Sequence, residues 1–276
     1  MNSPPPGQSI KAEEIKKGCH VIRALFIACL ISLPAHAAGP IVVNSGGQQT
    51  AVVELYTSEG CSSCPPADRW LSRLVETPAD ELHLLALSFH VDYWDYLGWK
   101  DRFSSAEYTR RQRQLGANNH QRTIYTPEFF VNGMEARGSS NILSKIEQVN
   151  AEPAPLNLEL TVSRDQTGLV MELRAPENGI DGPLHHRYLV YENNLTTDVR
   201  KGENAGRTLR HQQVVRYMSR ALVLRGENRH RIAIDPDWNG ENLGVAVLVT
   251  SPGSKDYHAA LHTPVAALLI RGSNAN

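Results

Sequence analysis

Two cysteines three residues apart, Cys61 and Cys64, constrain the fold of this chain more than any other feature. They follow residues 51–58, an apolar and β-branched run that predicts a buried strand. Residues 67–75 then place apolar side chains at helical spacing, which predicts a helix packed on a sheet. The two prolines after Cys64 fit the first turn of that helix, where backbone N–H groups have no helical partner. The pair is therefore expected where a buried strand meets a helix N-terminus.

The N-terminal segment has the pattern of a secretory signal peptide spanning residues 1–37. Basic residues precede a short apolar run over residues 24–33, and Ala35-His-Ala37 follows a proline. The run is shorter than the ~20 apolar residues that a membrane span needs. Cleavage after Ala37 predicts a periplasmic or secreted protein, in which a disulfide persists. It also removes Cys19 and Cys29, so that Cys61 and Cys64 remain as the only cysteines.

The composition after export excludes some classes of partner. Without residues 1–37, 24 basic and 27 acidic residues remain, so the protein has no excess of positive charge for nucleic acid or an anionic membrane. No Gly-rich phosphate loop and no Gly-x-Ser-x-Gly motif is present, so neither nucleotide binding nor serine hydrolysis is favoured. The remaining length allows one large domain or two smaller ones.

Residues 38–152 have the pattern of an α/β domain. Its elements are expected in the order strand, helix, strand, helix, strand, hairpin and helix, at residues 51–58, 67–75, 82–89, 104–115, 124–131, 132–138 and 141–149. Asn132-Gly133 is a strong hairpin signal. Strands alternating with helices predict parallel pairing at the start. A Pro-rich segment over residues 151–155 is the expected linker.

Residues 153–276 predict a second domain of different class. Polar and apolar side chains alternate over residues 156–162, which is typical of a strand with one buried face. Further strand-like runs occur at residues 169–174, 186–191, 230–234, 243–250 and 257–262. Short strands separated by turns, with little helical pattern, predict an all-β, sandwich-like domain.

The cysteine pair predicts thiol chemistry. A thiolate is the species that attacks a disulfide, and a helix N-terminus stabilises its negative charge. Cys61 is expected to be the exposed nucleophile and Cys64 the buried resolving thiol. The same spacing also occurs in static disulfides and in metal sites. A structural zinc site would need two further ligands, and no second cysteine pair remains.

Polar and aromatic residues follow the second expected strand, at the end where the cysteine loop should lie. His90, Asp92 and Asp95 suit proton transfer to Cys64 or, for His90 with both cysteines, a copper site. Their alternative role is to satisfy loop backbone groups. The neighbouring aromatic residues fit either a groove for a peptide partner or core packing: Tyr93, Trp94, Tyr96 and Trp99.

A group of charged residues stands out in the second half. An anion or partner site is one interpretation, and solvated charges along a strand face are the other. The basic residues are Arg207, Arg210, His211, Arg216 and Arg220, and Glu203 and Asn204 stand just before them.

The strand, cysteine loop and helix, followed by Thr126-Pro127 at the start of a later strand, resemble the thioredoxin superfamily. The resemblance implies that Pro127 is a cis-proline facing the cysteine pair. It also implies that Thr126 offers backbone hydrogen bonds to an extended substrate. A trans proline opening an edge strand is the alternative. The sequence departs from thioredoxin in having Ser62-Ser63 between the cysteines, and residues there tune thiolate stability.

Three further motifs resemble a family of exported bacterial proteins, the domain-of-unknown-function 1223 family. They are Phe89-His-Val-Asp-Tyr-Trp-Asp95, Leu97-Gly-Trp-Lys100, and Gly202-Glu-Asn-Ala-Gly-Arg207 with His211 and Val214-Val-Arg216. The resemblance covers nearly the whole chain after residue 37. It supports the fold and implies little about substrate.

The sequence thus predicts an exported thiol-disulfide oxidoreductase that acts on a protein or on a small thiol or disulfide. A mixed disulfide at Cys61 would be resolved by Cys64, with no cofactor and with the direction of electron flow left open. Two alternatives remain. One is a copper chaperone that uses Cys61, Cys64 and His90, and the other is a binding module with a structural disulfide.

Overall fold

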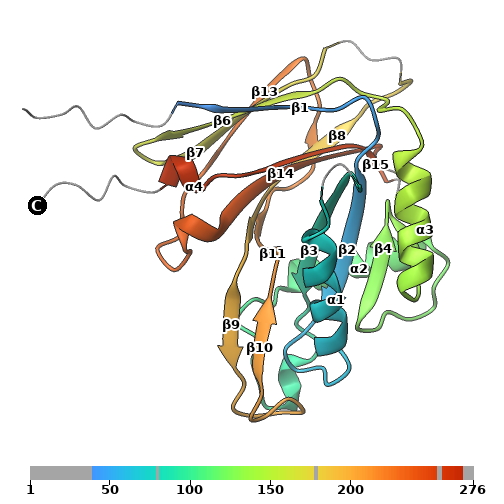
Figure 1. Ribbon diagram of the computed structural model, residues 1–276, viewed down its shortest axis with the longest axis vertical. Coiled ribbons are helices and arrows are strands. Elements are labelled where there is room, and N and C mark those ends of the chain that lie inside the picture. Colours follow the sequence, from blue (N-terminus) through green and yellow to red (C-terminus); the bar gives the residue numbers. More distant parts are fainter. Residues whose placement is uncertain (1–38, 79–80, 177–179, 254–256, 270–276) are drawn as a thin grey trace, which may run out of the picture. The chain divides into compact units, whose positions relative to one another are not determined.

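The computed structural model describes residues 39–78, 81–176, 180–253 and 257–269 (Figure 1). The predicted signal peptide, with Cys19 and Cys29, lies outside the described residues. Among the residues described, no helix combines the length and apolar character that a membrane crossing requires. Contacts group the described residues into one unit, a mixed α/β structure with more strand than helix.

A nine-stranded sheet carries the cysteine loop. Eight of its strands follow the order β15-β14-β8-β11-β3-β2-β4-β5, and β12 pairs with β8. Their bounds are β2 (Ala51–Thr57), β3 (Leu84–His90), β4 (Glu128–Val131), β5 (Met134–Ala136), β8 (His185–Glu192), β11 (Val214–Met218), β12 (Leu222–Val223), β14 (Leu243–Thr250) and β15 (Tyr257–Pro264). As predicted, β2 and β3 are parallel; β3 and β11 are also parallel, and the remaining pairs are antiparallel.

The helices alternate with the first strands in the predicted order. They are α1 (Pro65–Val75), α2 (Ala106–Asn118) and α3 (Ser139–Asn150), and a 3₁₀ turn η1 (Asp95–Leu97) precedes α2. The α2 helix begins at Ser105, whose hydroxyl accepts a hydrogen bond from the backbone N–H of Glu107. The predicted hairpin is also present, because Asn132 and Gly133 both have positive φ between β4 and β5.

The strand before the cysteines is buried on both faces. Successive side chains of a strand point to opposite sides, so β2 contributes to two cores. Val53 and Leu55 pack with α1 and α3, through residues such as Leu71 and Ile146. Val52 and Tyr56 belong to the other core, which includes Tyr108 and Leu115 of α2. Helices on both faces explain the continuous apolar pattern of this strand.

A second, four-stranded sheet has the order β1-β6-β7-β13. Its strands are β1 (Ile41–Asn44), β6 (Glu159–Asp165), β7 (Gly168–Arg174) and β13 (Glu227–Ile232); η2 (Gly240–Asn242) and α4 (Ala266–Leu269) complete this part. Leu160 and Val162 of β6 share a core with Val245 and Val247 of β14. The sandwich-like packing therefore joins this sheet to strands of the nine-stranded sheet.

The boundary expected at residue 152 does not divide the strands into separate sheets. Strands β8, β11, β14 and β15 extend the sheet formed by β2 to β5, and β1 pairs with β6. The junction is at β3, where Ser88 N donates to Gln213 O at 2.8 Å. Without β11, this edge of β3 would leave backbone groups unpaired, which explains why the two halves of the chain share one sheet.

A short two-stranded ribbon was not predicted. It consists of β9 (Leu195–Asp198) and β10 (Thr208–His211), and it lies beside α1 (Figure 1). Residues 199–207 connect the two strands and are called the strap below. Hydrogen bonds from Val199 N to Arg207 O and from Gly206 N to Val199 O close the strap. The ribbon brings a segment of the second half of the sequence against the cysteine loop.

Candidate active site around Cys61 and Cys64

Cys61 and Cys64 form a disulfide between the end of β2 and the start of α1, with their Cα atoms 5.4 Å apart. Cys64 is the N-cap of α1, and its N–H donates to Cys61 O at 3.2 Å. Both cysteines are 0 % exposed, whereas Ser62 and Ser63 are exposed. The prediction of an exposed Cys61 is therefore wrong for this oxidised state. Neighbouring segments cover the residue.

The Thr126–Pro127 peptide bond is cis, which confirms the predicted isomer. The carbonyl oxygen of Thr126 lies 3.8 Å from Cys61 Sγ. The sequence thus correctly places this dipeptide beside the cysteine pair. That Thr126 binds a substrate backbone remains a prediction.

Trp94 lies beside the cysteine loop, where it contacts both Thr126 and Gly60. Its indole Nε1–H donates to Thr126 Oγ1 at 2.7 Å. A Cβ at Gly60 would lie 3.1 Å from Trp94 Cβ, so a larger residue there would push the cysteine loop and Trp94 slightly apart. The loop after β3 therefore connects the segment before Cys61 to the cis-proline segment.

The strap covers the loop from another direction. The Asn204 amide Nδ2 donates to Glu59 O and to Cys61 O, both at 2.9 Å. The Ser62 backbone N–H donates to Glu203 Oε2 at 3.0 Å. Hydrogen bonds from Ser62 lower the pKa of Glu203. In the sequence, Glu203 and Asn204 stand just before a cluster of basic residues, and their contact with the cysteine loop was not predicted.

Five ionisable residues form a buried acid–histidine cluster beside the loop: Glu59, Asp68, His90, Asp101 and His211. His90 Nδ1 lies 2.6 Å from Asp101 Oδ2. His211 Nε2 lies 3.4 Å from Glu59 Oε1, and its Nδ1 lies 3.9 Å from Asp68 Oδ2. The rings of His90 and His211 are 4.9 Å apart. The cluster therefore connects β3 and α1 to the base of the ribbon.

The pKa shifts in this cluster have distinct causes. Burial raises the pKa of Asp68, although both histidines oppose the shift. Burial also disfavours the charged form of His90, but the Asp101 carboxylate outweighs it and raises the pKa of His90. Burial alone would raise the pKa of Asp101, but the attraction of His90 outweighs it and lowers the pKa of Asp101. His90 and Asp101 are therefore expected to be a charged pair at neutral pH.

This pair predicts that the free energy of unfolding falls as the pH rises above about 6.5. The stabilisation is complete below the unfolded pKa of histidine, ~6.5, and is lost as the pH passes the raised pKa of folded His90. The loss is at most about 1.4 kcal/mol per pH unit for one proton. Denaturant unfolding between pH 6 and 9 measures it. His90→Gln should flatten the dependence of the unfolding free energy on pH. His83→Gln, at an exposed position, is the control and should leave this dependence unchanged. An unchanged dependence in His90→Gln would contradict a charged His90–Asp101 pair.

The geometry does not gather Cys61, Cys64 and His90 as metal ligands. Within the described parts of the chain, no group of three or more His, Cys, Asp or Glu residues is placed to hold a metal ion. His90 Nδ1 is hydrogen-bonded to Asp101 Oδ2.

Two acidic residues of the loop after β3 hold the loop itself. Asp92 accepts a hydrogen bond from the Thr109 hydroxyl, and Asp95 accepts from the Ser104 hydroxyl and from Asp101 N. These contacts agree with the alternative that Asp92 and Asp95 stabilise the loop rather than transfer protons.

The aromatic residues of this loop have different surroundings. Trp99 Nε1–H donates to Glu59 Oε2 at 2.8 Å, and the Tyr93 hydroxyl donates to Gln112. Tyr96, in contrast, is 79 % exposed.

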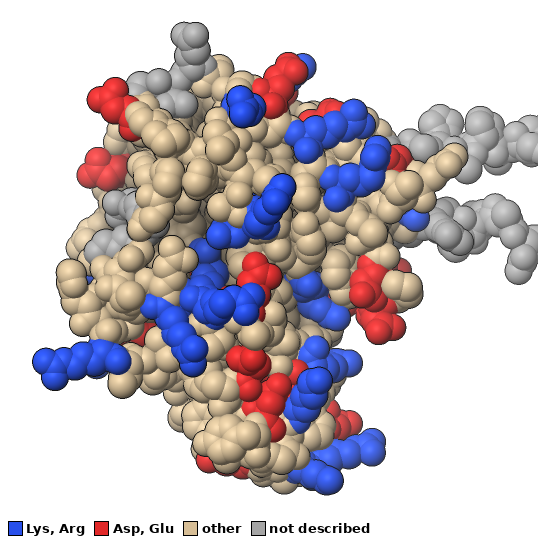
Figure 2. Space-filling view, turned by 180° about the vertical axis from the view of Figure 1, so that it is seen from behind, with Lys and Arg blue, Asp and Glu red and all other residues tan. Residues whose placement is uncertain are grey.

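The basic residues of the second half do not form one patch. His211 is buried, and Arg207 donates to Asn204 Oδ1 at 3.0 Å. Arg216 forms an ion pair with the buried Glu192. Arg210 and Arg220 are exposed. Figure 2 shows basic and acidic side chains interspersed over one face of the molecule.

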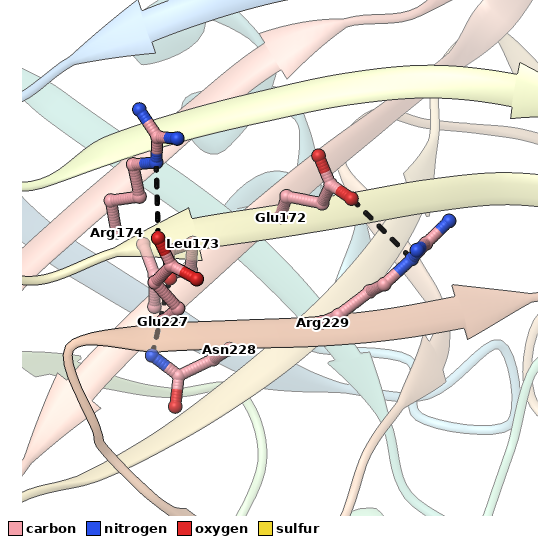
Figure 3. Close-up of a pocket in the computed structure, with 6 residues that line it drawn as sticks. All are labelled: Glu172, Leu173, Arg174, Glu227, Asn228 and Arg229. Carbon is pink, nitrogen blue, oxygen red and sulfur yellow. Dashed lines mark hydrogen bonds and ion pairs between the residues drawn. The ribbon is translucent and has the colours of Figure 1, made fainter.

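A hollow of about 330 Å³ on the outer face of the four-stranded sheet lies between β7 and β13 (Figure 3). It is lined by Glu172, Leu173, Arg174, Glu227, Asn228 and Arg229. Arg229 pairs with Glu172 at 3.4 Å, and Arg174 with Glu227 at 3.9 Å, all with largely exposed side chains. Such exposed pairs contribute about 0–1 kcal/mol each. None of these residues belongs to the elements around the cysteines, so the hollow is a feature of cross-strand pairing.

Two solved structures share the fold of this chain. A crystal structure of a protein from Agrobacterium tumefaciens is 23% identical, with a TM-score of 0.58, and the match covers 79% of this chain and 95% of that one. HBP35 of Porphyromonas gingivalis is 16% identical, with a TM-score of 0.63, and the match covers 84% and 79%. No significant match was found among curated proteins. The model of the family described as protein of unknown function (DUF1223) matches residues 52–250, and the chain belongs to this family.

Proposed function

We propose that the chain is an exported thiol-disulfide oxidoreductase with a thioredoxin-like core, acting through Cys61 and Cys64. The observation that carries the proposal is the position of the disulfide. It lies at the N-terminus of α1, with the carbonyl of Thr126, before the cis-proline, 3.8 Å from Cys61 Sγ. The order β2-α1-β3-α2-β4-β5-α3 around it supports the thioredoxin-like assignment. Export rests on the signal pattern of residues 1–37.

The local geometry suits reversible exchange. The positive end of the helix dipole at the start of α1 favours a thiolate at the cysteine pair, although Pro65 and Pro66 provide no N–H group there. The Cα atoms, 5.4 Å apart, are at a separation common for disulfides. The pair is therefore expected to open and close without rearrangement of β2 or α1.

The proposed reaction proceeds in two steps. The Cys61 thiolate attacks a substrate disulfide, forms a Cys61–substrate disulfide and releases one substrate thiolate. Cys64 then loses its proton and attacks Cys61 Sγ, which forms the Cys61–Cys64 disulfide and releases the second substrate thiolate. Two electrons pass from the cysteine pair to the substrate. The reverse sequence oxidises a dithiol, and the partner's reduction potential sets the direction.

A binding module with a structural disulfide is the second candidate, and one observation favours it. Both cysteines are 0 % exposed, and a disulfide without exposed surface is shielded from thiols. The exposed Ser62 and Ser63 between the cysteines favour exchange instead, because they leave the outer side of the loop open to a partner. The copper alternative has no comparable support in the arrangement of His90.

The test is trapping by the Cys64→Ser variant. Incubated with oxidised glutathione or a disulfide-linked peptide, this variant should keep a mixed disulfide on Cys61, visible as a mass increase, because its resolving thiol is missing. Cys61→Ser is the matched control and should form little adduct, because Cys64 only resolves the mixed disulfide in the proposed reaction. A folded Cys64→Ser variant that forms no adduct with either probe would favour the structural disulfide.

A further inference from the structure

The strap contributes one buried polar side chain to an otherwise exposed turn. Residues 200–208 are exposed except for Asn204, which is 0 % exposed. The Asn204 amide donates to Glu59 O and Cys61 O, and its oxygen accepts from Arg207. Both the amide nitrogen and the amide oxygen therefore have partners inside the protein. Asn204 acts as a clamp between the ribbon and the cysteine loop.

Glu203 adds a negative charge at the same place. Its carboxylate accepts a hydrogen bond at 3.0 Å from Ser62 N, the backbone group that directly follows Cys61. This region, at the start of α1, also stabilises a thiolate on Cys61 after reduction. Because Ser62 directly follows Cys61, the Glu203 carboxylate would lie close to such a thiolate, and like charges disfavour one another. Glu203 thus opposes formation of the reactive form of Cys61.

Access to Cys61 is restricted in the oxidised protein. Exchange requires an incoming sulfur to reach Cys61 Sγ, yet Cys61 has no exposed surface. Trp94 and Thr126 flank it, and the strap covers the loop through Glu203 and Asn204. The strap belongs to a two-stranded ribbon outside both large sheets, so its displacement would break neither of them.

We propose that Glu203 and Asn204 are positioning residues of the exchange site, and that the strap selects which thiols react at Cys61. Asn204 holds the strap closed, and Glu203 sets a negative charge against the Cys61 thiolate. Small thiols and disulfides therefore react slowly, because they offer too little contact to displace the strap, whereas a protein partner that binds residues 199–207 opens it and reacts faster. The inference rests on the proposed function and deepens it toward a protein partner.

The experiment compares Asn204→Ala and Glu203→Gln with wild type and with Glu227→Gln. Glu227 is a matched control because it is an exposed acid in the four-stranded sheet. The rate at which glutathione reduces the disulfide should rise about tenfold in Asn204→Ala, which lacks the clamp's hydrogen bonds. In the reduced protein, alkylation of Cys61 by iodoacetamide at pH 6 should be about three- to tenfold faster in Glu203→Gln, because its pH profile shifts to lower pH. Glu227→Gln should match wild type.

A purely structural role for the strap would change the unfolding curve but not the pH profile of alkylation. Glutamine keeps the shape of Glu203, so this profile tests the proposal even if Asn204→Ala folds poorly. An unchanged profile in Glu203→Gln, in a protein whose wild type exchanges disulfides, overturns this inference alone. A wild type that exchanges with no probe in any redox buffer overturns the proposed function and the inference with it.

Discussion

Arg111→Met is expected to lower the free energy of unfolding by about 3–5 kcal/mol. Arg111 of α2 reaches Glu54 of β2 with two hydrogen bonds, Nε to Oε2 at 2.7 Å and Nη2 to Oε1 at 3.0 Å. The Glu54 side chain is 0 % exposed, and the hydroxyls of Tyr56 and Tyr257 also donate to its carboxylate. Removal of Arg111 leaves a buried carboxylate without its cation. Urea unfolding followed by circular dichroism measures the loss.

An exposed ion pair of the same type is the control. Arg137 lies 2.6 Å from Glu135, but its side chain is 71% exposed. Arg137→Met should therefore cost less than about 1 kcal/mol. The double variant Glu54→Leu/Arg111→Met should recover part of the stability, because no uncompensated charge remains. A loss below 1 kcal/mol in Arg111→Met would contradict the claim that this pair stabilises the packing of α2 on β2.

Local signals in the sequence predict the elements that carry the cysteines. The periodicity of residues 51–58 and 67–75 corresponds to β2 and α1, and Asn132-Gly133 corresponds to the β4–β5 hairpin. Each of these elements is specified by its own residues, through side-chain spacing or turn preference. The cis-proline at Pro127 came from a resemblance, because nothing in its neighbours distinguishes the isomer.

The strands that join the two halves of the chain could not be predicted in the same way. Residues 214–218 form β11 because they pair with both β8 and β3. The position of β11 therefore depends on strands that are far away in the sequence. The polar β10 carries His211, whose buried ring faces Glu59 and Asp68, two residues far away in the sequence. Spacing along the chain does not reveal such non-local partners. The boundary expected at residue 152 was misleading for the same reason.

The burial of Cys61 has a similar origin. Its expected exposure followed from its place in a loop before a helix, and the exposed Ser62 and Ser63 agree with that local argument. Asn204, about 140 residues later, supplies the side chain that covers the loop backbone. Its signal in the sequence was weak: one asparagine in a Gly-rich turn, in a motif shared with a family. Only the path of the ribbon shows that it contacts Cys61.

The central claim is that this buried disulfide is reversible, and the expected effect is large. A structural disulfide in an exported protein has a reduction potential below about −300 mV, whereas exchange-active pairs lie roughly between −300 and −120 mV. Because a tenfold change in the equilibrium constant corresponds to about 30 mV, the two cases differ by several orders of magnitude in glutathione buffer. The exposed Ser62 and Ser63 and the helix N-terminus favour a reduction potential of the Cys61–Cys64 pair in the range of exchange-active pairs.

The most direct measurement is a redox titration of the native protein without residues 1–37. Aliquots equilibrated in glutathione or dithiothreitol buffers are quenched with acid and alkylated, and mass spectrometry counts the free thiols. The account predicts a reversible two-electron transition from zero to two modified cysteines, with a midpoint above about −300 mV in the folded state. A pair that stays oxidised throughout this range, and that is modified only after unfolding, would contradict it.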